Sequence, residues 1–506
     1  MNLAIADSPG EQTQSKIRST ADGGAYISWF DNRSGGYDVY LQRIDKNGVE
    51  QWQHNGILIA DRNFSSTQDY GLAVDADGNA LITYRDDRFG GTQIGANLVS
   101  SDGTLLWGAN GVTLTSSANG NAPKCVVLSD GTYAIGWTGA TSPASVVVQR
   151  LNSGGVEQWS PPVSLSEASR PFNLSDICDG SDGSVILLWV RCSGTNCVTS
   201  NKHLYAQKLA SDGSPSWNSG SPVIVFNTTS LQTANFPTMV ADGSGGTVTS
   251  WYETGGSRNA YVQHLDADGN SLFPAPGSVV NTTAGVYRIS AWADYDRTTG
   301  ETVAVWTQSN TTQSMWGLSA QKFDETGTRL WGDGGVELLP MSTNQSSFAR
   351  VVSYAGGAIA SAFDARSVTT GVVIAARLDS DGSPLWAGTA IEACSVESGK
   401  SRLDAAQNGC DLLLTWGDSR FDARDIFIQN VKANGSLGPT VPAPGDMNCS
   451  ETIDLNDIEP FVTAVLNANA YNAQFPCCNI AAADMNEDLL VNGVDIALFA
   501  AALIGN

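Results

Sequence analysis

Apolar residues in the first 440 positions form short runs, separated by polar, glycine-rich turns such as "ADGG", "DADG" and "LSDG". One run in each unit ends at or near an aromatic residue, and a second aromatic series, from Trp52 to Trp386, follows the same period of about 55 residues. Each unit reads as four short antiparallel strands joined by turns, which is the pattern of a β-propeller blade. The first aromatic series comprises Trp29, Tyr84, Trp137, Trp189, Trp251, Trp306, Phe363 and Trp416.

The third and fourth strands of the units are the clearest, as in "VYLQRIDKNGVEQW" and "VVVQRLNSGGVEQW", where Asn-Gly or Gly-Gly joins two strands. A glutamine recurs in the third strand of six units. A side chain repeated in this way is expected to bind neighbouring backbone, so we interpret it as structural. The six residues are Gln42, Gln149, Gln207, Gln263, Gln321 and Gln429.

The number of blades depends on the two ends of the repeat. Seven units carry both aromatic markers, whereas the eighth, from about Lys400 to Pro439, lacks a fourth strand. "LAIAD" at residues 3–7 is similar to "ILIAD" at residues 57–61 and can supply that strand. We therefore predict an all-β, eight-bladed propeller over residues 1–439, closed by the N-terminal strand, which removes an exposed sheet edge. A seven-bladed ring with one irregular insertion is the alternative.

Charge and hydropathy narrow the range of partners. The 506 residues include 51 acidic and 27 basic side chains, a formal net charge of -24, which disfavours nucleic acid and anionic membrane surfaces as partners. No stretch of about twenty apolar residues is present, so membrane insertion is not expected. The N-terminal segment lacks the pattern of a signal peptide, and we expect that one has been removed from an extracellular or cell-surface protein.

The nine cysteines lack the paired C-x-x-C spacing of zinc sites. Disulfides in an oxidising compartment fit them better, with one thiol left over. Cys192 and Cys197 bracket the longest loop of the fourth unit, and we predict a local disulfide between them.

A Pro- and Gly-rich linker at residues 440–445 separates the propeller from a second domain, residues 446–506. Two twelve-residue windows in this domain, "DMNCSETIDLND" and "DMNEDLLVNGVD", place side-chain oxygens at positions 1, 3, 5, 9 and 12, with a backbone carbonyl available at position 7. Calcium prefers six to eight oxygen ligands, which EF-hand-like loops supply in this alternating way. The predicted Ca²⁺ ligands are Asp446, Asn448, Ser450, Thr452, Asp454 and Asp457, then Asp484, Asn486, Asp488, Leu490, Asn492 and Asp495.

Two such loops, each followed by one helical segment with a phenylalanine at a matching place, Phe461 and Phe499, resemble a type I dockerin. The resemblance covers residues 446–506 and implies a small α-helical, calcium-dependent domain that binds a cohesin-like receptor. A disulfide between Cys449 and Cys478 would join the first loop to the segment between the repeats. The domain contains no Lys or Arg. Another copy of the chain is the alternative partner.

The loops between the second and third strands carry Asp-x-Arg in four units that become neighbours when the ring closes. One hypothesis makes this arc a groove for a glycan or peptide. The other makes each pair a clamp that fixes its own loop. We expect the clamp, and therefore a ligand site elsewhere on the same face or in the mouth of the central channel. The residues are Asp31 and Arg33, Asp86 and Arg88, Asp364 and Arg366, and Asp418 and Arg420.

Catalytic patterns are scarce. The three histidines are His54, His203 and His264, and we expect the last two at solvated positions on third strands. There is no Gly-x-Ser-x-Gly motif, so Ser-His-Asp hydrolysis is not expected. The repeat resembles uncharacterised secreted bacterial repeat propellers, which implies a fold and no activity. We predict a secreted, non-catalytic binding or scaffold module for a glycan or protein ligand. A secreted glycoside hydrolase or lyase with a dockerin, or a self-assembling surface component, are the alternatives.

Overall fold

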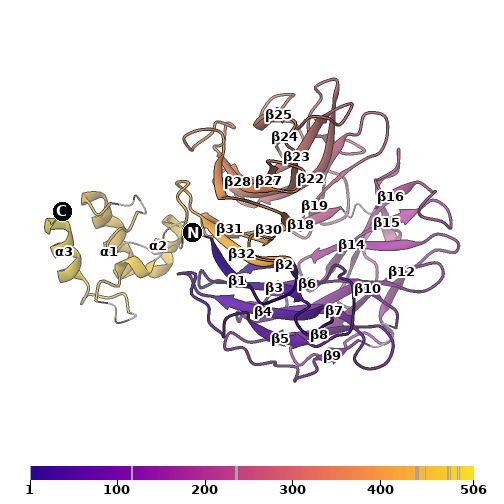
Figure 1. Ribbon diagram of the computed structural model, residues 1–506, viewed down its shortest axis with the longest axis horizontal. Coiled ribbons are helices and arrows are strands. Elements are labelled where there is room, and N and C mark those ends of the chain that lie inside the picture. The colour runs from indigo at the N-terminus through magenta and orange to yellow at the C-terminus, as the bar shows by residue number, and fades with distance from the viewer. Residues whose placement is uncertain are drawn as a thin grey trace.

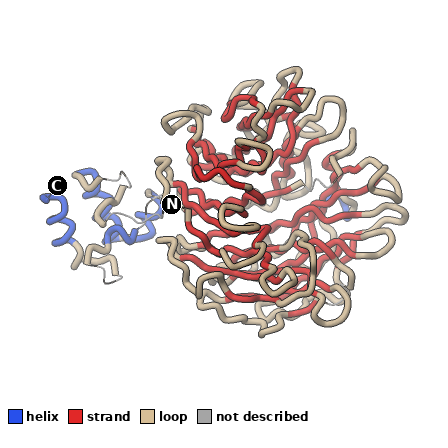
Figure 2. The backbone as a smooth tube through the Cα atoms, viewed as in Figure 1, coloured by secondary structure: helices blue, strands red, loops and turns tan. Residues whose placement is uncertain are grey.

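The computed structural model describes residues 2–114, 118–233, 237–438, 444–448, 450, 452–475, 478, 480–486, 488 and 490–505. Within these residues the strands form eight four-stranded antiparallel sheets, arranged around a centre (Figure 1). Strands fill the first part of the chain, while the helices lie mostly in its C-terminal part (Figure 2). The eight sheets confirm the predicted eight-bladed propeller, and the seven-bladed alternative is wrong.

In blades 1 to 7 the four strands follow one another from the innermost to the outermost. Blade 1 comprises β2 (Gln12–Ser19), β3 (Ala25–Asp31), β4 (Asp38–Ile44) and β5 (Ile57–Ala60); blade 2 comprises β6 (Gly71–Val74), β7 (Ala80–Asp86), β8 (Gln93–Val99) and β9 (Val112–Thr113). Blade 3 comprises β10 (Asn121–Val127), β11 (Tyr133–Gly139), β12 (Ser145–Leu151) and β13 (Val163–Leu165); blade 4 comprises β14 (Phe172–Asp179), β15 (Val185–Cys192), β16 (Lys202–Leu209) and β17 (Val223–Phe226).

Blade 5 comprises β18 (Thr238–Ala241), β19 (Thr247–Tyr252), β20 (Ala260–Leu265) and β21 (Ser278–Val279); blade 6 comprises β22 (Val286–Asp296), β23 (Glu301–Asn310), β24 (Trp316–Phe323) and β25 (Val336–Ser342). Blade 7 comprises β26 (Ser346–Tyr354), β27 (Gly357–Ala365), β28 (Gly371–Leu378) and β29 (Ile391–Ser398). Blade 8 takes β30 (Lys400–Asn408), β31 (Asp411–Asp418) and β32 (Asp425–Val431) from the end of the repeat, and its fourth strand is β1 (Leu3–Ala6).

The N-terminal strand closes the ring as predicted. β1 pairs antiparallel with β32, with Leu3 opposite Ile428 and Ala6 opposite Ile426. The innermost strands also form an unbroken circle, because each contacts the first strand of the next blade and β30 contacts β2. The beginnings of these eight strands therefore surround one central channel.

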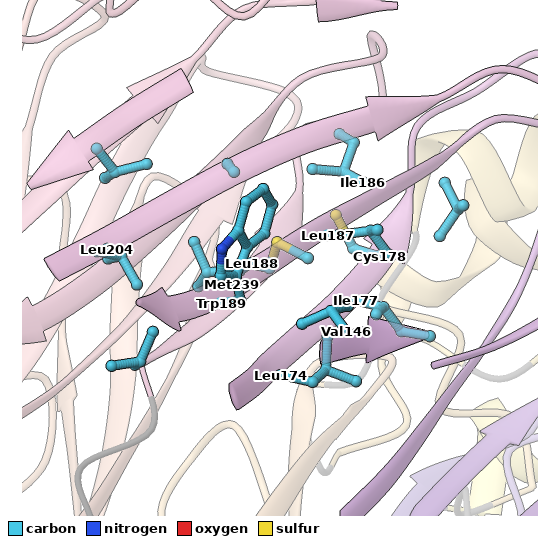
Figure 3. Packing of buried hydrophobic residues seen from close by; sticks show 14 of the residues in the cluster. Val146, Leu174, Ile177, Cys178, Ile186, Leu187, Leu188, Trp189, Leu204 and Met239 are labelled. Carbon is cyan, nitrogen blue, oxygen red and sulfur yellow. The ribbon is translucent and has the colours of Figure 1, made fainter. Parts of the chain in front are cut away.

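Aromatic residues at the ends of the second strands fill the space between neighbouring sheets. Trp29, Trp137, Trp189, Trp306 and Trp416 are completely buried. Figure 3 shows Trp189 of β15 among aliphatic side chains of blades 3, 4 and 5, including Val146, Leu174 and Met239. Burying such large apolar surfaces between sheets is the main source of stability that a propeller of short strands has. The 55-residue aromatic period is thus the period of the core.

The repeated glutamine has the structural role that its recurrence indicates. Gln149 accepts the backbone N–H of Trp159 at 3.2 Å and donates to the carbonyl of the same residue at 3.0 Å. Gln42, Gln207, Gln263 and Gln321 likewise bond the backbone of their own hairpins. In blade 2, Asn97 makes the equivalent bonds to Trp107 and Gly108. In each case the amide side chain holds the fourth strand's entry against the third strand.

The cysteines agree with the sequence only in part. Cys192 and Cys197 form the predicted disulfide. Cys410 and Cys478 are also disulfide-bonded. Cys449 and Cys477 lie outside the described residues, so the Cys449–Cys478 pair stays a prediction. The expected single leftover thiol is wrong, because Cys125, Cys178 and Cys394 are all reduced. They belong to strands of three different blades, where burial raises the pKa of Cys125 to about 12 and also raises that of Cys178.

The C-terminal part has its own small core. It comprises α1 (Ile458–Leu466), α2 (Ala468–Gln474), α3 (Ile496–Gly505) and three-residue and four-residue helical turns at Leu455–Asp457 and Ile480–Ala483. Phe461 and Phe499 stack at its centre with ring centroids 3.9 Å apart and planes 3° from parallel. The two phenylalanines occupy matching places after the two loops, so the duplication in the sequence is a duplication in the packing. No helix among the described residues is long and apolar enough to cross a membrane.

Candidate functional site

The four Asp-x-Arg loops lie at the ends of second strands in blades 1, 2, 7 and 8, as the repeat predicts. Asp31, Asp86 and Asp418 are the last residues of β3, β7 and β31, and Asp364 is the penultimate residue of β27. Each aspartate lies close to the arginine two positions later in its own loop: Arg33 contacts Asp31, Arg88 contacts Asp86 at 2.8 Å, Arg420 contacts Asp418 at 2.6 Å and Arg366 approaches Asp364 at 3.4 Å.

These aspartates also hold their loops from within. Asp31, Asp86 and Asp418 each accept the backbone N–H of the arginine in the motif, at 2.9 to 3.1 Å. Asp418 further accepts the indole N–H of Trp416 at 2.9 Å and contacts Lys400 at 3.0 Å. Burial opposes its ionisation, but the bonds from Arg420 and Ser398 lower the pKa of Asp418 to about 2. The arrangement is that of a turn clamp.

Three of the four clamp arginines, Arg33, Arg88 and Arg420, lie over aromatic rings of their own blades. Arg33 lies over Tyr40 at 4.3 Å and Arg420 over Phe427 at 3.9 Å. The aspartate contact and the ring below restrict the position of each of these guanidinium groups. The sequence pattern therefore identified four equivalent loops but not a shared groove.

A second set of equivalent positions lies on the innermost strands. In seven blades one residue of the first strand is paired with the residue just before the marker of the second strand, and in blade 7 the equivalent residue is paired with Ser361, two residues before Phe363. We call these eight residues the channel ring, since they occupy one level around the central channel. The channel ring comprises Lys16, Gly71, Lys124, Asp176, Thr238, Trp292, Arg350 and Asp404.

A β-bulge precedes the channel ring in six blades, as the register shifts show in β2, β10, β14, β22, β26 and β30. In five of these strands a non-glycine residue of the bulge has a positive φ, for example 56° at Gln14 and 53° at Phe348. Bulges re-aim side chains and are frequent beside functional sites. Because the bulges recur just before the channel ring, they explain how the side chains of the ring residues can depart from the alternating directions of a regular strand.

One arc of the channel ring, from blade 8 through blade 4, is charged. Asp69 contacts Lys16 at 2.8 Å and also binds Lys124, while Asp404 contacts Arg18 at 3.0 Å and Arg350 at 3.6 Å. Although burial opposes ionisation, these cations lower the pKa values of Asp69 and Asp404. Burial raises the pKa of Asp176, whose nearest opposing charge is Lys124. Arg18 of blade 1 also interacts with Asp176 of blade 4, so the charges share one space.

The other arc, in blades 5 to 7, is aromatic and hydroxylated. A pocket of about 240 Å³ opens here, and its wall includes Thr238, Ser290, Trp292, Ser347, Phe348 and Arg350. The guanidinium of Arg350 lies 4.0 Å from the centre of the Trp292 ring, and its Nε has no hydrogen-bond partner among the described residues. Phe348 is 37% exposed. Since Thr238, Trp292 and Arg350 belong to the channel ring, the pocket is part of the channel wall.

The sequence led us to expect a ligand site elsewhere on the same face or in the mouth of the central channel, without naming these residues. The signal that could have found them is the alignment of the repeats at the position twelve to fourteen residues before the marker, where residue type changes from blade to blade. Gly71 is the exception with a steric reason, because a Cβ there would approach Cys125 Sγ to 2.6 Å. Every other ring residue is polar, charged or aromatic.

The histidine expectations need one correction. His264 is buried, at 4% exposure, and its Nε2 lies 3.0 Å from a carboxylate oxygen of Asp242. The expected solvated position is therefore wrong for His264, because its strand turns this side chain toward the next blade, where it contacts Tyr295. Burial works against ionisation of Asp242, but the bond from His264 lowers the pKa of Asp242 to about 2.

The two predicted calcium loops have the same internal hydrogen bonds. Asp457, at position 12, accepts the N–H groups of Met447 and Asn448 on Oδ1 and that of Asp454 on Oδ2, at 2.7 to 3.0 Å. Asp495 accepts the equivalent N–H groups of Met485, Asn486 and Asn492, at 2.9 to 3.3 Å. Both carboxylates are completely buried. The loops are therefore folded around their twelfth residues.

Positions 1 and 3 of each loop receive the N–H of position 5: Asp446 and Asn448 bind Ser450, while Asp484 and Asn486 bind Asp488. The side-chain atoms that can coordinate a cation at the predicted ligand positions are all oxygens, which suits a hard cation such as Ca²⁺. Within the described ranges, no three His, Cys, Asp or Glu side chains gather as metal ligands. The predicted set also uses Asn, Ser and backbone oxygens, and it stays a prediction.

No protein-family model matches the chain, and no curated protein matches it. Solved structures similar to it include the Dos1 propeller, at 11% identity and a TM-score of 0.46, covering 87% of this chain and 96% of that one. They also include a PL25 ulvan lyase bound to a GlcA–Rha3S saccharide, at 12% identity and a TM-score of 0.45, covering 79% and 96%. The polysaccharide lyase Uly1 matches at 11% identity and a TM-score of 0.42, covering 85% and 91%. At such identities the likeness concerns the fold alone.

Proposed function

We propose that the propeller is a non-catalytic glycan-binding module whose site is the pocket between blades 5, 6 and 7 at the channel. The observation that supports this most directly is the combination of an exposed aromatic face with hydroxyl groups and an arginine in one concave wall. Sugar rings present C–H faces that pack on aromatic rings and hydroxyl groups that hydrogen-bond to polar side chains.

The charged arc supports binding without turnover. A glycoside hydrolase of the usual kind needs two carboxyl groups, one to donate a proton and one to act as base or nucleophile. Asp69 and Asp404 each bind two cations, which holds both ionised and occupies their oxygens. Asp176 is then the one carboxyl group of the channel ring that forms no ion pair within the described part of the chain, and one such group is not a catalytic pair.

A glycan array followed by calorimetric titration tests the proposal on the full chain. Wild type should bind a glycan, and Phe348→Ala, which removes a partly exposed ring that also packs edge-to-face on Phe363, should weaken binding about tenfold to a hundredfold. Phe89→Ala is the matched control, since Phe89 is also exposed, at 50%, but lies in blade 2. Unchanged affinity in Phe348→Ala, or release of sugar products by the wild type, would contradict the proposal.

We further propose that residues 446–506 form a calcium-dependent attachment domain for a cohesin-like receptor. The first predicted loop has three aspartates within twelve residues, Asp446, Asp454 and Asp457, and the domain has no Lys or Arg to offset the repulsion among its acids. A bound cation would remove this repulsion. On α1, Ile458, Val462 and Leu466 recur every four residues and are 42 to 79% exposed, an apolar face suited to a protein partner.

Calorimetry of the full chain with and without a chelator tests the attachment domain. We expect a separate unfolding transition that calcium moves to higher temperature, and its loss in Asp457→Asn combined with Asp495→Asn. Glu459→Gln, an exposed acid outside the predicted ligand positions, should retain it. A transition that ignores calcium would contradict calcium binding, and calcium-dependent self-association in sedimentation would replace the receptor by a second copy.

A further inference from the structure

Asp425 is a buried acid at the place where the N-terminal strand closes the ring. It begins β32 and is completely buried. Neither carboxylate oxygen has a hydrogen-bond partner among the described residues. It lies opposite Asp418 of β31, and the pairing of Ala6 with Ile426 brings Asp7 beside it from β1. A buried carboxylate without donors is strongly unfavourable when ionised.

Blade 1 contains the same acid with its partners in place. Asp38 begins β4 and lies opposite Asp31, as Asp425 begins β32 and lies opposite Asp418. Asp38 accepts the backbone N–H of Arg62 at 2.6 Å and the hydroxyl of Ser34. In blade 8 the position of Ser34 is taken by Phe421, and β1 replaces β5, so both donors are missing. The difference arises at the joint where two distant parts of the chain complete one blade.

The groups that face Asp425 are acids, and the nearby bases are engaged elsewhere. Burial, followed by repulsion from Asp422 and Asp7, raises the pKa of Asp425 to about 7, and Asp422 is within hydrogen-bonding reach. From the other elements, Arg420 and Lys400 bind Asp418, Arg424 binds Glu11, and His54 binds Asp7 and Glu50. Two carboxyl groups within hydrogen-bonding reach of each other are compatible only if a proton lies between them.

We infer that Asp425 keeps a proton in the closed ring, sharing it with Asp422, and that the neutral acid lets β1 pair with blade 8, a joint that weakens when the proton leaves. The protonated oxygen donates a hydrogen bond to the ionised carboxylate. Release of the proton to water leaves two anions facing each other beside Asp7. The propeller thus carries a proton-binding site at its closure, independent of the glycan pocket and of the calcium loops.

The direction of the pH effect follows from proton linkage. The folded chain holds the proton up to about pH 7, while an unfolded aspartate releases it near pH 4. Between these values the folded state binds more protons, so the stability of the joint falls as pH rises and levels off above about pH 7. One proton changes the opening equilibrium by at most about tenfold per pH unit.

Hydrogen exchange of the β1 amides across pH 4.5 to 8.5, corrected for intrinsic rates, tests the inference on the full chain. In wild type the protection of β1 should fall with rising pH. In Asp425→Asn it should be constant, because the amide is neutral at every pH and can donate to Asp422. Asp38→Asn is the matched control in blade 1 and should keep the wild-type pH dependence. Constant protection in wild type, or an unchanged pH dependence in Asp425→Asn, would overturn the inference.

Two further variants keep the test decisive if Asp425→Asn fails to fold. Asp422→Asn removes one repelling carboxylate and should move the midpoint of the β1 transition to lower pH. His54→Gln should leave the midpoint in place, although bonds from Glu50 and Asp7 raise the pKa of His54 against its burial. If His54→Gln abolishes the pH dependence, or if β1 protection follows calcium and chelator instead of pH, the shared proton is wrong.

Discussion

The Asp-x-Arg loops and the channel ring are two sets of equivalent positions in one propeller, and they differ in what the blades do with them. The loops repeat the same pair in four blades, and in each the arginine contacts the aspartate of its own loop. The ring changes from lysine to aspartate, threonine, tryptophan and arginine around the same level. Its residues contact residues of other blades, as Arg350 contacts Asp404.

This difference separates the demands of folding from those of recognition. A blade-local need, such as fixing a turn, is the same in every blade, so one solution can recur. A ligand that meets the channel touches each blade differently, and its site therefore breaks the repeat. A set of identical residues in a repeat protein is better evidence for local structure than for a shared site.

The largest expected effect in either set comes from a clamp. Asp418→Ala should lower the free energy of unfolding by about 3 to 5 kcal/mol, because it leaves Arg420 and Lys400 buried without a counter-charge. Asp364→Ala is the control and should cost less, since Arg366 is one-third exposed and also contacts Glu392 at 2.8 Å. Denaturant unfolding measures both. Altered glycan affinity in folded Asp418→Ala would break the separation between the two sets.

Acid titration of the same clamp gives a pH prediction. Because the pKa of Asp418 is lowered to about 2 in the folded chain, its ionisation stabilises the fold above about pH 4, and this contribution is lost as pH falls toward 2. Wild type should lose stability over this range faster than Asp418→Ala does. Parallel curves of stability against pH for the two proteins would show that the carboxylate does not act through its charge.

The next largest effect concerns the ring. Trp292→Ala should weaken glycan binding by about 1 to 3 kcal/mol, since it removes both a stacking face and the surface under Arg350. Titration calorimetry measures the change, and melting temperature shows whether the fold is retained. Trp331→Ala removes a tryptophan from the second aromatic series, 7% exposed, and should reduce stability while sparing affinity. An equal loss of affinity in both variants would indicate general damage.

Most of the propeller could be predicted because its determinants are local and repeated. The 55-residue aromatic period gave the blades, and the likeness of "LAIAD" to "ILIAD" gave the closure that β1 and β32 make. The hydrogen bonds between the repeated glutamine and the backbone could be predicted equally well. The reduced state of Cys125, Cys178 and Cys394 was not, since pairing depends on distances between blades. His264 was missed because burial of one side chain depends on the neighbouring sheet.

The candidate site could be predicted only as a region. Its residues come from blades 5, 6 and 7 and meet through bulges, which one-dimensional patterns do not reveal. The calcium loops were the reverse case, because all their predicted ligands lie within twelve residues. A local motif can be recognised in the sequence. Predicting a site assembled around a ring requires the register of every strand that contributes to it.

The smallest expected effect on glycan affinity gives the most direct test of the clamp interpretation. Arg33 is 26% exposed in its side chain, binds the Asp31 of its own loop and lies on Tyr40. Arg33→Ala leaves the completely buried Asp31 with the backbone N–H of residue 33 and the indole N–H of Trp29, so it should cost about 1 to 3 kcal/mol of stability and leave glycan affinity unchanged. Arg350→Lys, in the ring, keeps the charge but loses the planar group and should weaken binding with little effect on stability. If Arg33→Ala instead weakens binding as much as Arg350→Lys, the loops contribute to recognition and the two sets are one site.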